Sequence, residues 1–389
     1  MEPSSTPRPR AAQGASTEPA RVLVRGVNWL GDAVMTTPAL LRLRERFPNA
    51  HISLLTAEKL ADLWGHHPAI DAILAFAPDE TLGRIARQLR RDPFDLGIVL
   101  PNSPRSALEL WWSGVPRRIG YRRPWRNWLL TETVRPREHE IPMRKRSAAV
   151  IRRLVAGGSG APAGEVPRLP MAAHHLHQYL HLVAAVGADP TPVAPLLHLS
   201  GDERRTARAL VVGLGQTEGL GRRQRWLGLN PGAEYGPAKR WPTDRFAAVA
   251  NEVSRQLDCG WLIFGGSRDQ TMAGEIARAV PTAVSLAGRT TLRQLMVALT
   301  SCELLLTNDT GPMHLAAALG TPVMALFGST SPELTGPGLP GDIRHRLLKS
   351  RVPCSPCFRR ECPIDHRCMK EFEGPAVAQE ILTMLASRR

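Results

Sequence analysis

The sequence predicts an α/β protein with two Rossmann-like domains that face each other across a cleft. Short apolar segments alternate with helical ones along most of the 389 residues, which is typical of parallel sheets covered by helices. This alternation occurs twice, and a chain of this length has room for two hydrophobic cores. No Gly-x-Gly-x-x-Gly follows a predicted strand, which argues against an NAD site and leaves the cleft as the natural ligand site.

The first domain begins with a strand at 21–25, a glycine-rich turn and a helix that ends near Phe47. Pro38 is expected to kink this helix or restart it. The spacing Gly26-x4-Gly31 matches a Walker A loop, but Asp32 stands where that motif needs Lys, so a P-loop NTPase is disfavoured. The remaining predicted elements are strands at 51–55, 70–74 and 96–100, and helices ending near 64 and at 82–89, 106–112, 143–155 and 172–186.

The second domain repeats the pattern after a weak strand at 196–199, a weak helix at 202–212 and a tract at 213–225 that is rich in Gly, Gln and Arg. Its predicted strands are 227–230, 261–264, 283–286, 304–306 and 323–327, and its helices 243–257, 270–279, 291–299, 313–319 and 375–387. We therefore predict an N-terminal domain over 21–190, a linker with a flexible insertion over 191–228, a C-terminal domain over 229–374 and a closing helix over 375–389.

Composition narrows the possible environments and partners. Residues 1–20 are rich in Pro, Ser, Ala and Arg without an apolar stretch, which predicts a disordered tail and no signal peptide. No apolar run reaches the 18 residues that a membrane span needs. The net charge of +15 favours anionic partners such as nucleic acid, a phosphorylated glycolipid or an acidic membrane face. Without an export signal, we expect a cytoplasmic protein.

The stretch 307–322 carries the strongest signal for a ligand site. It reads as a buried strand, a polar turn, a helix and a second strand, with Gly311 allowing close backbone approach and Pro312 suiting a first helical turn. The free N–H groups of that helix start favour phosphate oxygens, and Asp309, Thr310 and His314 surround it. The alternative interpretation is an ordinary N-cap followed by a solvated histidine.

Asp32 and Lys239 are the other two candidates. Asp32 follows the carboxyl end of the first strand, where open α/β sheets bind ligands. Near a helix dipole its carboxylate should stay ionised, and it could accept a proton as general base. The alternative is that Asp32 simply caps the helix. Lys239 ends a glycine-rich loop, 230–242, just before a helix, and it could neutralise a pyrophosphate. An ordinary surface lysine remains the alternative.

Three motifs, Gly31-Asp32, the Lys239 loop, and Asp309-Thr310-Gly311 with His314, resemble the ADP-heptose:lipopolysaccharide heptosyltransferases, the family 9 glycosyltransferases. The segment 354–363 is similar to the heptosyltransferase II subgroup. This resemblance implies a GT-B fold and inverting transfer of heptose from ADP-heptose to a heptosyl–Kdo–lipid A inner core. The site would lie at the cytoplasmic face of the inner membrane, in peripheral contact with it.

The resemblance also implies residue roles. Asp32 matches the proposed catalytic base, while Lys239 and the helix start at 310–314 would stabilise the departing ADP. Glu234 and Tyr235 align with positions that contact the donor phosphates, and the loop 265–269 with Arg268 is similar to the donor-side loop near the adenosine. With these groups supplying charge, no cofactor or chelated divalent cation should be required.

Other features leave alternatives open. An arginine- and tryptophan-rich region suits a phosphorylated saccharide acceptor, a nucleic acid or plain solvation; its candidate acceptor-binding residues are Arg117, Arg118, Arg122 and Arg123. The set Cys354-x2-Cys357-x4-Cys362-x5-Cys368 could bind zinc, pair or stay free. His174, His177 and His181 share a helical face and suggest a partly solvated stripe more than a metal site.

Two other functions fit parts of the sequence. One is a different GT-B reaction, such as that of heptosyltransferase I or III or a nucleotide-sugar epimerase. The other is a basic nucleic-acid-binding protein, against which the two-domain pattern with its motif loops argues. The acceptor hydroxyl and the oligomeric state stay open.

Overall fold

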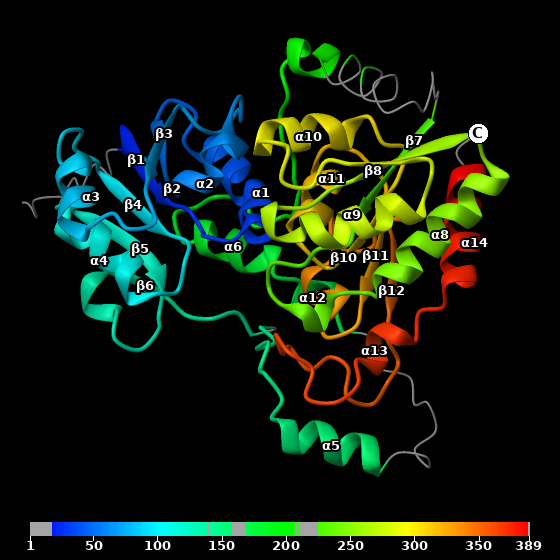
Figure 1. Cartoon of the computed structure of the whole chain (residues 1–389). Coiled ribbons are helices and arrows are strands. Elements are labelled where there is room, and N and C mark those ends of the chain that lie inside the picture. The colour runs from blue at the N-terminus through cyan, green and yellow to red at the C-terminus, as the bar shows by residue number, and fades with distance from the viewer. Residues whose placement is uncertain are drawn as a thin grey trace, which may run out of the picture.

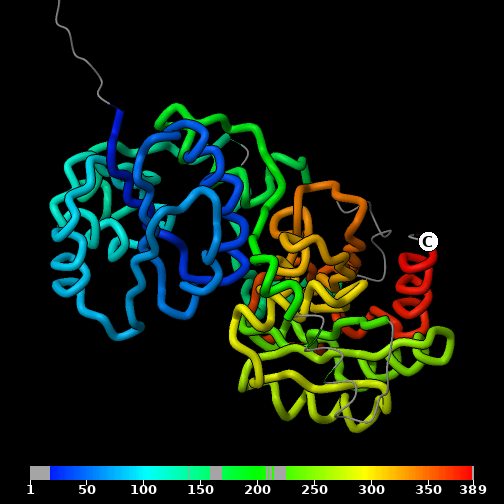
Figure 2. The backbone as a smooth tube through the Cα atoms, turned by 90° about the horizontal axis from the view of Figure 1, so that it is seen from above, coloured from blue at the N-terminus to red at the C-terminus, as the bar shows by residue number. Residues whose placement is uncertain are grey.

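The computed structural model describes residues 18–387, except 139, 158–168, 207–208, 210–212 and 214–224. The predicted tail and most of the predicted insertion at 213–225 lie outside this description. So does most of the segment 157–170, whose Gly, Ala and Pro residues predict a loop. Figures 1 and 2 show two lobes, one built by the first half of the chain and one by the second. None of the described helices is long and apolar enough to cross a bilayer.

The N-terminal lobe contains a parallel six-stranded sheet in the order β3-β2-β1-β4-β5-β6. The order reverses direction beside β1, which places a topological switch point at its carboxyl end. Val22, Leu23 and Val24 of this strand are buried on both faces. The strands are β1 (Arg21–Arg25), β2 (His51–Ala57), β3 (Ala72–Phe76), β4 (Leu96–Val99), β5 (Arg117–Tyr121) and β6 (Glu132–Val134).

The C-terminal lobe repeats this architecture with the order β12-β11-β10-β7-β8-β9, again all parallel. The two sheets confirm the predicted α/β fold with two Rossmann-like halves. The strands are β7 (Arg225–Asn230), β8 (Cys259–Ile263), β9 (Ala283–Ser285), β10 (Leu305–Asn308), β11 (Val323–Phe327) and β12 (Arg346–Lys349). The exact domain bounds given above stay predictions.

Helices cover both sheets (Figure 1). In the N-terminal half they are α1 (Leu30–Arg46), α2 (Glu58–Ala61), η1 (Asp62–Trp64), α3 (Leu82–Leu89), α4 (Pro104–Trp112), η2 (Asn127–Leu129), α5 (Ala148–Ala156), η3 (Met171–Ala173) and α6 (Leu176–Ala184). In the C-terminal half they are η4 (Pro237–Lys239), α8 (Thr243–Gln256), η5 (Ser267–Asp269), α9 (Gln270–Ala279), α10 (Leu292–Thr300), α11 (Gly311–Ala318), α12 (Pro332–Thr335), α13 (Arg367–Lys370) and α14 (Gly374–Ala386). Residues 201–206 are also helical.

Local signals explain several helix starts. At α10, Thr291 Oγ1 accepts from Gln294 N at 3.2 Å and Gln294 Oε1 accepts from Thr291 N at 2.8 Å, which forms a capping box. At α4, Ser103 caps the helix and Pro104 occupies its first turn. Helix α10 therefore begins within one residue of its predicted start, and α4 begins two residues before its own.

The structure corrects two expectations. Helix α1 continues through Pro38 without a restart, because Thr37 Oγ1 donates to Val34 O at 2.8 Å and satisfies the carbonyl that a proline cannot bond. The predicted strand at 196–199 is wrong. That segment is extended but joins no sheet, since Leu196 N bonds Thr37 Oγ1 at 3.1 Å and Leu197 N bonds Ala318 O at 3.3 Å. It therefore bridges the two lobes.

Three strands were not predicted, namely β5, β6 and β12. β6 and β12 are edge strands, and β5 lies next to an edge. Their arginine, glutamate and lysine residues break the apolar pattern, which is common where one side of a strand meets solvent. Helix α5 also starts five residues later than predicted, at Ala148, where Ser147 Oγ caps Val150 N at 3.2 Å.

Candidate active site

Two helix starts, one from each lobe, meet at the centre of the molecule. Gly31 lies in the first turn of α1 and Gly311 begins α11. A Cβ at Gly31 would lie 2.8 Å from His314 Cδ2, and a Cβ at Gly311 would lie 2.8 Å from Leu30 Cδ2. Both glycines are therefore needed for close approach, and each helix start packs against a residue of the other lobe.

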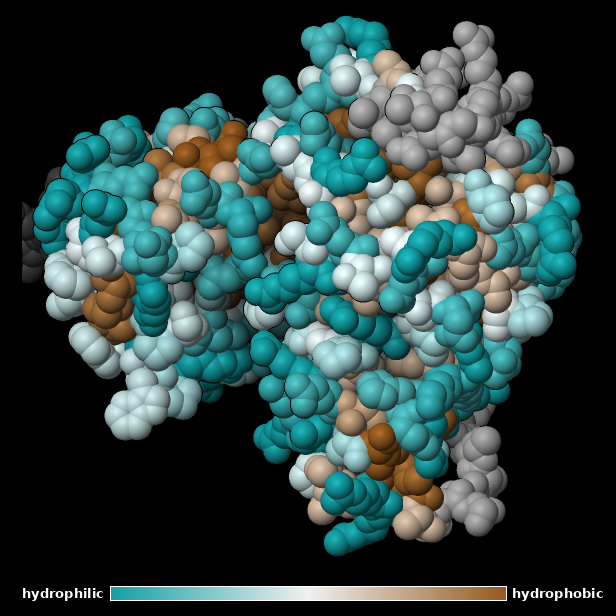
Figure 3. All heavy atoms as spheres, in the orientation of Figure 1, coloured by the Kyte–Doolittle hydropathy of each residue, from teal (hydrophilic) through white to brown (hydrophobic). Residues whose placement is uncertain are grey.

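A cavity of about 410 Å³ opens beside this contact, and residues of both lobes line it. The hollow between the lobes is visible in Figure 3. Of the candidate residues from the sequence, eight line this cavity: Asp32, Glu234, Tyr235, Lys239, Asp309, Thr310, Gly311 and His314. Cavities of this size between domains bind small ligands such as nucleotide sugars.

Lys239 and Asp309 form a buried ion pair in the wall of the cavity. Lys239 Nζ lies 2.6 Å from Asp309 Oδ2 and 3.3 Å from Asp309 O. Thr330 Oγ1 donates to the same carboxylate oxygen at 2.6 Å. The side chains of Lys239 and Asp309 are only 13% and 5% exposed, so solvent screens the pair weakly. Asp309 therefore positions the ammonium group beside the start of α11.

Buried asparagine side chains hold the Lys239 loop against β10. Asn308 Oδ1 accepts from Trp241 N at 3.1 Å, and Asn308 Nδ2 donates to Pro231 O at 2.7 Å. Asn230 Nδ2 donates to Thr307 Oγ1 at 3.2 Å. Because these amides join two loops at the carboxyl edge of the sheet, the distance between Lys239 and the α11 start is set by rigid neighbours.

Further cations gather on the aromatic side of the cavity. The Tyr235 ring centroid lies 5.0 Å from Lys239 Nζ and 5.2 Å from Arg360 Cζ. Arg360 also lies 6.0 Å from the ring of Trp29, which belongs to the other lobe. Tyr235 OH donates to Phe358 O at 2.9 Å. Two cations thus flank the Tyr235 ring where the two lobes approach each other, and Glu234 and Asp309 place carboxylates in the same lining.

Asp32 faces this cationic wall from the N-terminal lobe. Burial raises the pKa of its carboxyl above the ordinary value, and the charge of Asp309 raises it further. His175 and Lys239 act in the opposite direction on the pKa. The sequence predicts that the helix dipole keeps Asp32 ionised; burial, the largest influence on its pKa, acts against this, and the ionised state stays a prediction. A base with a raised pKa is a better proton acceptor at neutral pH.

His314 is neutral at physiological pH. Burial lowers the pKa of its imidazole to about 4, with Lys239 and His345 adding to the effect and Asp309 opposing it. A neutral imidazole both donates and accepts a hydrogen bond. His314 can therefore donate an N–H to a ligand oxygen without adding a full charge to the site.

Five predicted site residues lie outside the residues that line this cavity. Arg268 is exposed on η5. Arg117 pairs with Glu132, at 2.6 Å between Nε and Oε1, near the amino ends of their strands. Arg118 Nε donates to Leu129 O at 2.8 Å. Arg122 and Arg123 follow the carboxyl end of β5, and Arg123 pairs with Glu140 at 2.8 Å. Their ligand roles stay predictions.

The four cysteines of the segment 354–368 are free thiols. Cys354, Cys357, Cys362 and Cys368 lie near one another around a small gap that Ile151 and Ile364 close. Among the described residues, no three His, Cys, Asp or Glu side chains are arranged to hold a metal ion. The expected histidine stripe is partly wrong, because His174 is buried and bonds Gly336 O at 3.0 Å.

Sequence reasoning missed several residues at this site. Lys145 and Arg360 line the cavity but come from segments that we had interpreted only as a basic helix and a cysteine cluster. Thr330 follows the carboxyl end of β11, a position that the sheet topology marks as functional. His175 influences Asp32, and its Nε2 lies 3.2 Å from Tyr179 OH. The helical spacing of histidines pointed to its neighbours His174 and His177 but not to His175.

Two facing parallel sheets with a cavity between them, where a carboxylate from one lobe meets cations from the other, define a GT-B glycosyltransferase. The chain belongs to glycosyltransferase family 9 (heptosyltransferase), whose sequence profile matches residues 82–367. The family and fold that the resemblance implied are thus confirmed.

Individual relatives agree with this assignment. The chain is 31% identical to lipooligosaccharide heptosyltransferase 2 of Haemophilus influenzae over 329 residues, which are 81% of this chain and 85% of that protein. It is 29% identical to lipopolysaccharide heptosyltransferase 2 of Escherichia coli K12, covering 82% and 85% of the two chains. The solved structure of E. coli ADP-heptose lps heptosyltransferase II has a TM-score of 0.73 at 25% identity and covers 95% of this chain and 99% of its own.

Proposed function

We propose that this glycosyltransferase moves L-glycero-D-manno-heptose from ADP-heptose to the heptosyl–Kdo–lipid A inner core, with inversion at the anomeric carbon. The observation that carries the proposal is the placement of Asp32 opposite the Lys239–Asp309 pair and the start of α11 in one cavity. The names of the heptosyltransferase 2 relatives support the choice of donor and acceptor. Heptosyltransferase I or III activity is the alternative within the family.

In the proposed reaction, Asp32 removes the proton from the acceptor hydroxyl while its oxygen attacks the anomeric carbon. The bond from that carbon to the donor phosphate oxygen breaks on the opposite face, and the electron pair leaves with ADP. Negative charge therefore grows on the pyrophosphate, where Lys239 and the N–H groups of α11 lie ready to stabilise it. His314 donates a further hydrogen bond.

The chain's own cations supply the charge that this leaving group requires. Lys239, Arg360 and Lys145 line the cavity, and we propose that they act without a cofactor or a chelated divalent cation. Glu234 and Tyr235 lie at the same wall and would contact the donor. Arg268, near the carboxyl edge of the C-terminal sheet, would lie toward the adenosine end.

The acceptor contributes anionic groups of its own. Arg117, Arg118, Arg122 and Arg123 are proposed to contact its phosphates or carboxylates, as guanidinium groups do by paired hydrogen bonds. Because the lipid part of this acceptor is anchored in a bilayer, we propose that the enzyme works in the cytoplasm, at the inner face of the inner membrane. Nucleic acid is not part of the proposal.

Replacing Asp32 by Asn tests the proposal. The amide keeps the size of the side chain but cannot accept the proton, so we expect kcat to fall at least a hundredfold while ADP-heptose affinity stays within a few-fold. Release of ADP with heptosyl–Kdo–lipid A and with Kdo–lipid A separates heptosyltransferase II from I. A fully active Asp32→Asn enzyme would rule out the base assignment.

A further inference from the structure

Helix α5 projects from the body of the molecule as a separate arm at the bottom of Figure 1. Its inner face rests on the C-terminal lobe, where Ile151 packs against Cys354 and Cys357. Just before the helix, Arg146 N donates to Cys357 O at 3.0 Å and Arg359 Nη1 donates to Arg146 O at 3.1 Å. The helix is therefore fixed to the molecule along one face, and its outer face meets solvent.

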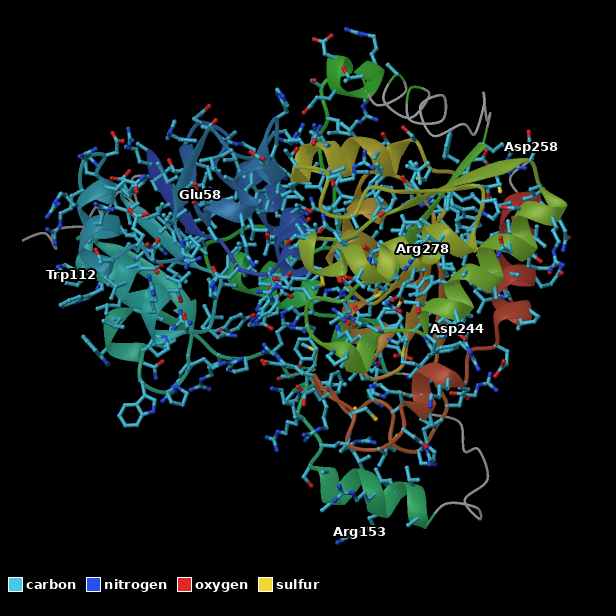
Figure 4. The ribbon with its side chains drawn as sticks, viewed as in Figure 1. Glu58, Trp112, Arg153, Asp244, Asp258 and Arg278 are labelled. Carbon is cyan, nitrogen blue, oxygen red and sulfur yellow. The ribbon has the colours of Figure 1, made fainter. Side chains whose placement is uncertain are left out.

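The segment 141–157, which contains α5, carries positive charge only. It has five basic residues and no acidic one: Arg144, Lys145, Arg146, Arg152 and Arg153. All of them except Arg146 are exposed. Figure 4 shows Arg153 on the side of α5 that points away from the molecule. A surface with this charge attracts anionic partners.

Apolar side chains are exposed among these cations. Val150 is 42% exposed on α5 and Met143 is 40% exposed on the preceding segment. Figure 3 shows hydrophobic side chains beside hydrophilic ones over this arm. A helix that presents both aliphatic and basic groups on its free side is typical of binding to a membrane surface, whereas nucleic-acid backbones offer nothing for the aliphatic groups.

The loop between β5 and β6 projects on the same side of the molecule in Figure 1. Trp125 in this loop is 86% exposed, and its backbone has a φ of +64°. A positive φ is unfavourable for the backbone of a bulky residue, so the loop presents the indole to solvent at a conformational cost. Tryptophan is enriched at the interface between bilayer and water, where its ring suits both environments.

We propose that α5 and the Trp125 loop together dock this enzyme on an anionic lipid bilayer, an inference that rests on the proposed glycolipid acceptor. Met143 and Lys145 line the active-site cavity, and α5 begins three residues after Lys145. The arm that binds the bilayer is therefore continuous with the cavity wall. Docking at this face brings the headgroup layer close to Asp32.

Binding of the full-length enzyme to lipid vesicles tests this proposal. Vesicles of phosphatidylcholine with phosphatidylglycerol are compared with vesicles of phosphatidylcholine alone in a sedimentation assay at increasing salt. We expect preference for the anionic vesicles and loss of binding with salt. Each basic residue near an anionic surface contributes about fivefold, so Arg152→Gln with Arg153→Gln should weaken binding roughly thirtyfold.

Controls separate this proposal from the proposed activity. The pair Arg87→Gln and Arg91→Gln removes the same charge from α3 and the turn that follows it, on another side of the N-terminal lobe, and should bind vesicles like the wild type. Trp125→Ala should weaken vesicle binding while keeping its salt dependence. The α5 double variant and the Arg87/Arg91 control should transfer heptose normally to a delipidated acceptor, since none of their changed residues lines the cavity.

Three results would overturn the docking surface. They are equal binding to both kinds of vesicle, wild-type vesicle binding by the α5 double variant, and tighter binding of that face to a DNA duplex than to anionic vesicles. If vesicles bind but no heptose is transferred to any acceptor, the proposed activity fails while the docking surface stands. If heptose is transferred but the enzyme does not bind vesicles, the docking surface fails while the proposed activity stands.

Discussion

Lys239 lies in the cavity wall beside the start of α11, where the donor pyrophosphate is proposed to bind. A charge-assisted hydrogen bond to phosphate contributes about 1.5–3 kcal/mol. Lys239→Met should therefore weaken ADP-heptose binding roughly ten- to a hundredfold and also lower kcat, as measured by calorimetry and by initial rates. Lys370→Met, an exposed lysine of α13, is the matched control. Unchanged donor affinity in the Lys239 variant would remove this residue from the donor site.

The pH dependence of the reaction reports on the residues around Asp32. Asp32 must be deprotonated to act as a base, so kcat/KM should fall as the pH drops through its raised pKa. Asp309 raises this pKa and Lys239 lowers it. Asp309→Asn should therefore move the acid limb of the profile to lower pH, and Lys239→Met should move it to higher pH. Shifts of both variants in the same direction would contradict this arrangement.

Sequence motifs identified the residues of this site that follow strands directly. Asp32, Lys239 and Asp309 stand in the segments that follow the carboxyl ends of predicted strands, so topology and local chemistry pointed to them together. Arg360 and His175 could not be found in this way. Arg360 reaches the cavity from a segment without regular structure, and His175 influences Asp32 only because α6 packs against α1.

At the scale of elements, the contact between α1 and α11 depends on having no side chain at Gly31. Alanine is a better helix former than glycine by about 1 kcal/mol, so Gly31→Ala should not unfold α1. Its Cβ would instead push against the His314 ring, and such overpacking costs about 1–3 kcal/mol. We expect kcat/KM to fall about tenfold or more with a small change in Tm.

Gly83→Ala is the control for this experiment, because a Cβ there meets no atom within 4 Å. It should leave kcat/KM unchanged and raise Tm slightly. Wild-type turnover in Gly31→Ala would show that the two helix starts can separate without harm to the site.

Elements with a continuous apolar pattern were predicted well, and edge elements were not. β1, α3, α9 and β11 have the bounds that the sequence indicated. β6 and β12 were not predicted because an edge strand pairs with only one neighbouring strand, so its sequence does not need a continuous apolar pattern. The segment 196–199 has the apolar pattern of a strand, but its backbone groups bond Thr37 and Ala318 instead of a neighbouring strand.

At the scale of the whole molecule, Arg293 links the two lobes. Its Nε donates to Glu203 Oε1 at 2.7 Å, and its Nη1 lies 3.4 Å from the carbonyl oxygens of Asp62 and Gly65 in the N-terminal lobe. The guanidinium of Arg293 and the Ser200 N–H, against the effect of burial, lower the pKa of Glu203 to about 2. One side chain of α10 thus joins the linker and the opposite lobe.

Arg293→Met should lower the free energy of unfolding by about 1–2 kcal/mol at neutral pH, as measured with urea. A carboxyl with a lowered pKa stabilises the folded state above its unfolded pKa, and the benefit is lost as the pH falls toward the folded value of about 2. The difference between variant and wild type should therefore shrink below about pH 4. Arg346→Met, which breaks an exposed pair inside one lobe, should cost less.

The sequence by itself determined two parallel sheets, the strand ends that carry the site, and the family. The spacing of hydrophobic residues and the residue types that favour turns act over a few residues, so they can be recognised in the sequence alone. Only the tertiary structure decided that Lys239 pairs with Asp309, that Arg360 and Lys145 reach the cavity, and that α5 leaves the lobe of its own sheet to rest on the other. Those facts depend on packing between segments far apart in the chain, and on burial, which sets the pKa values of Asp32 and His314.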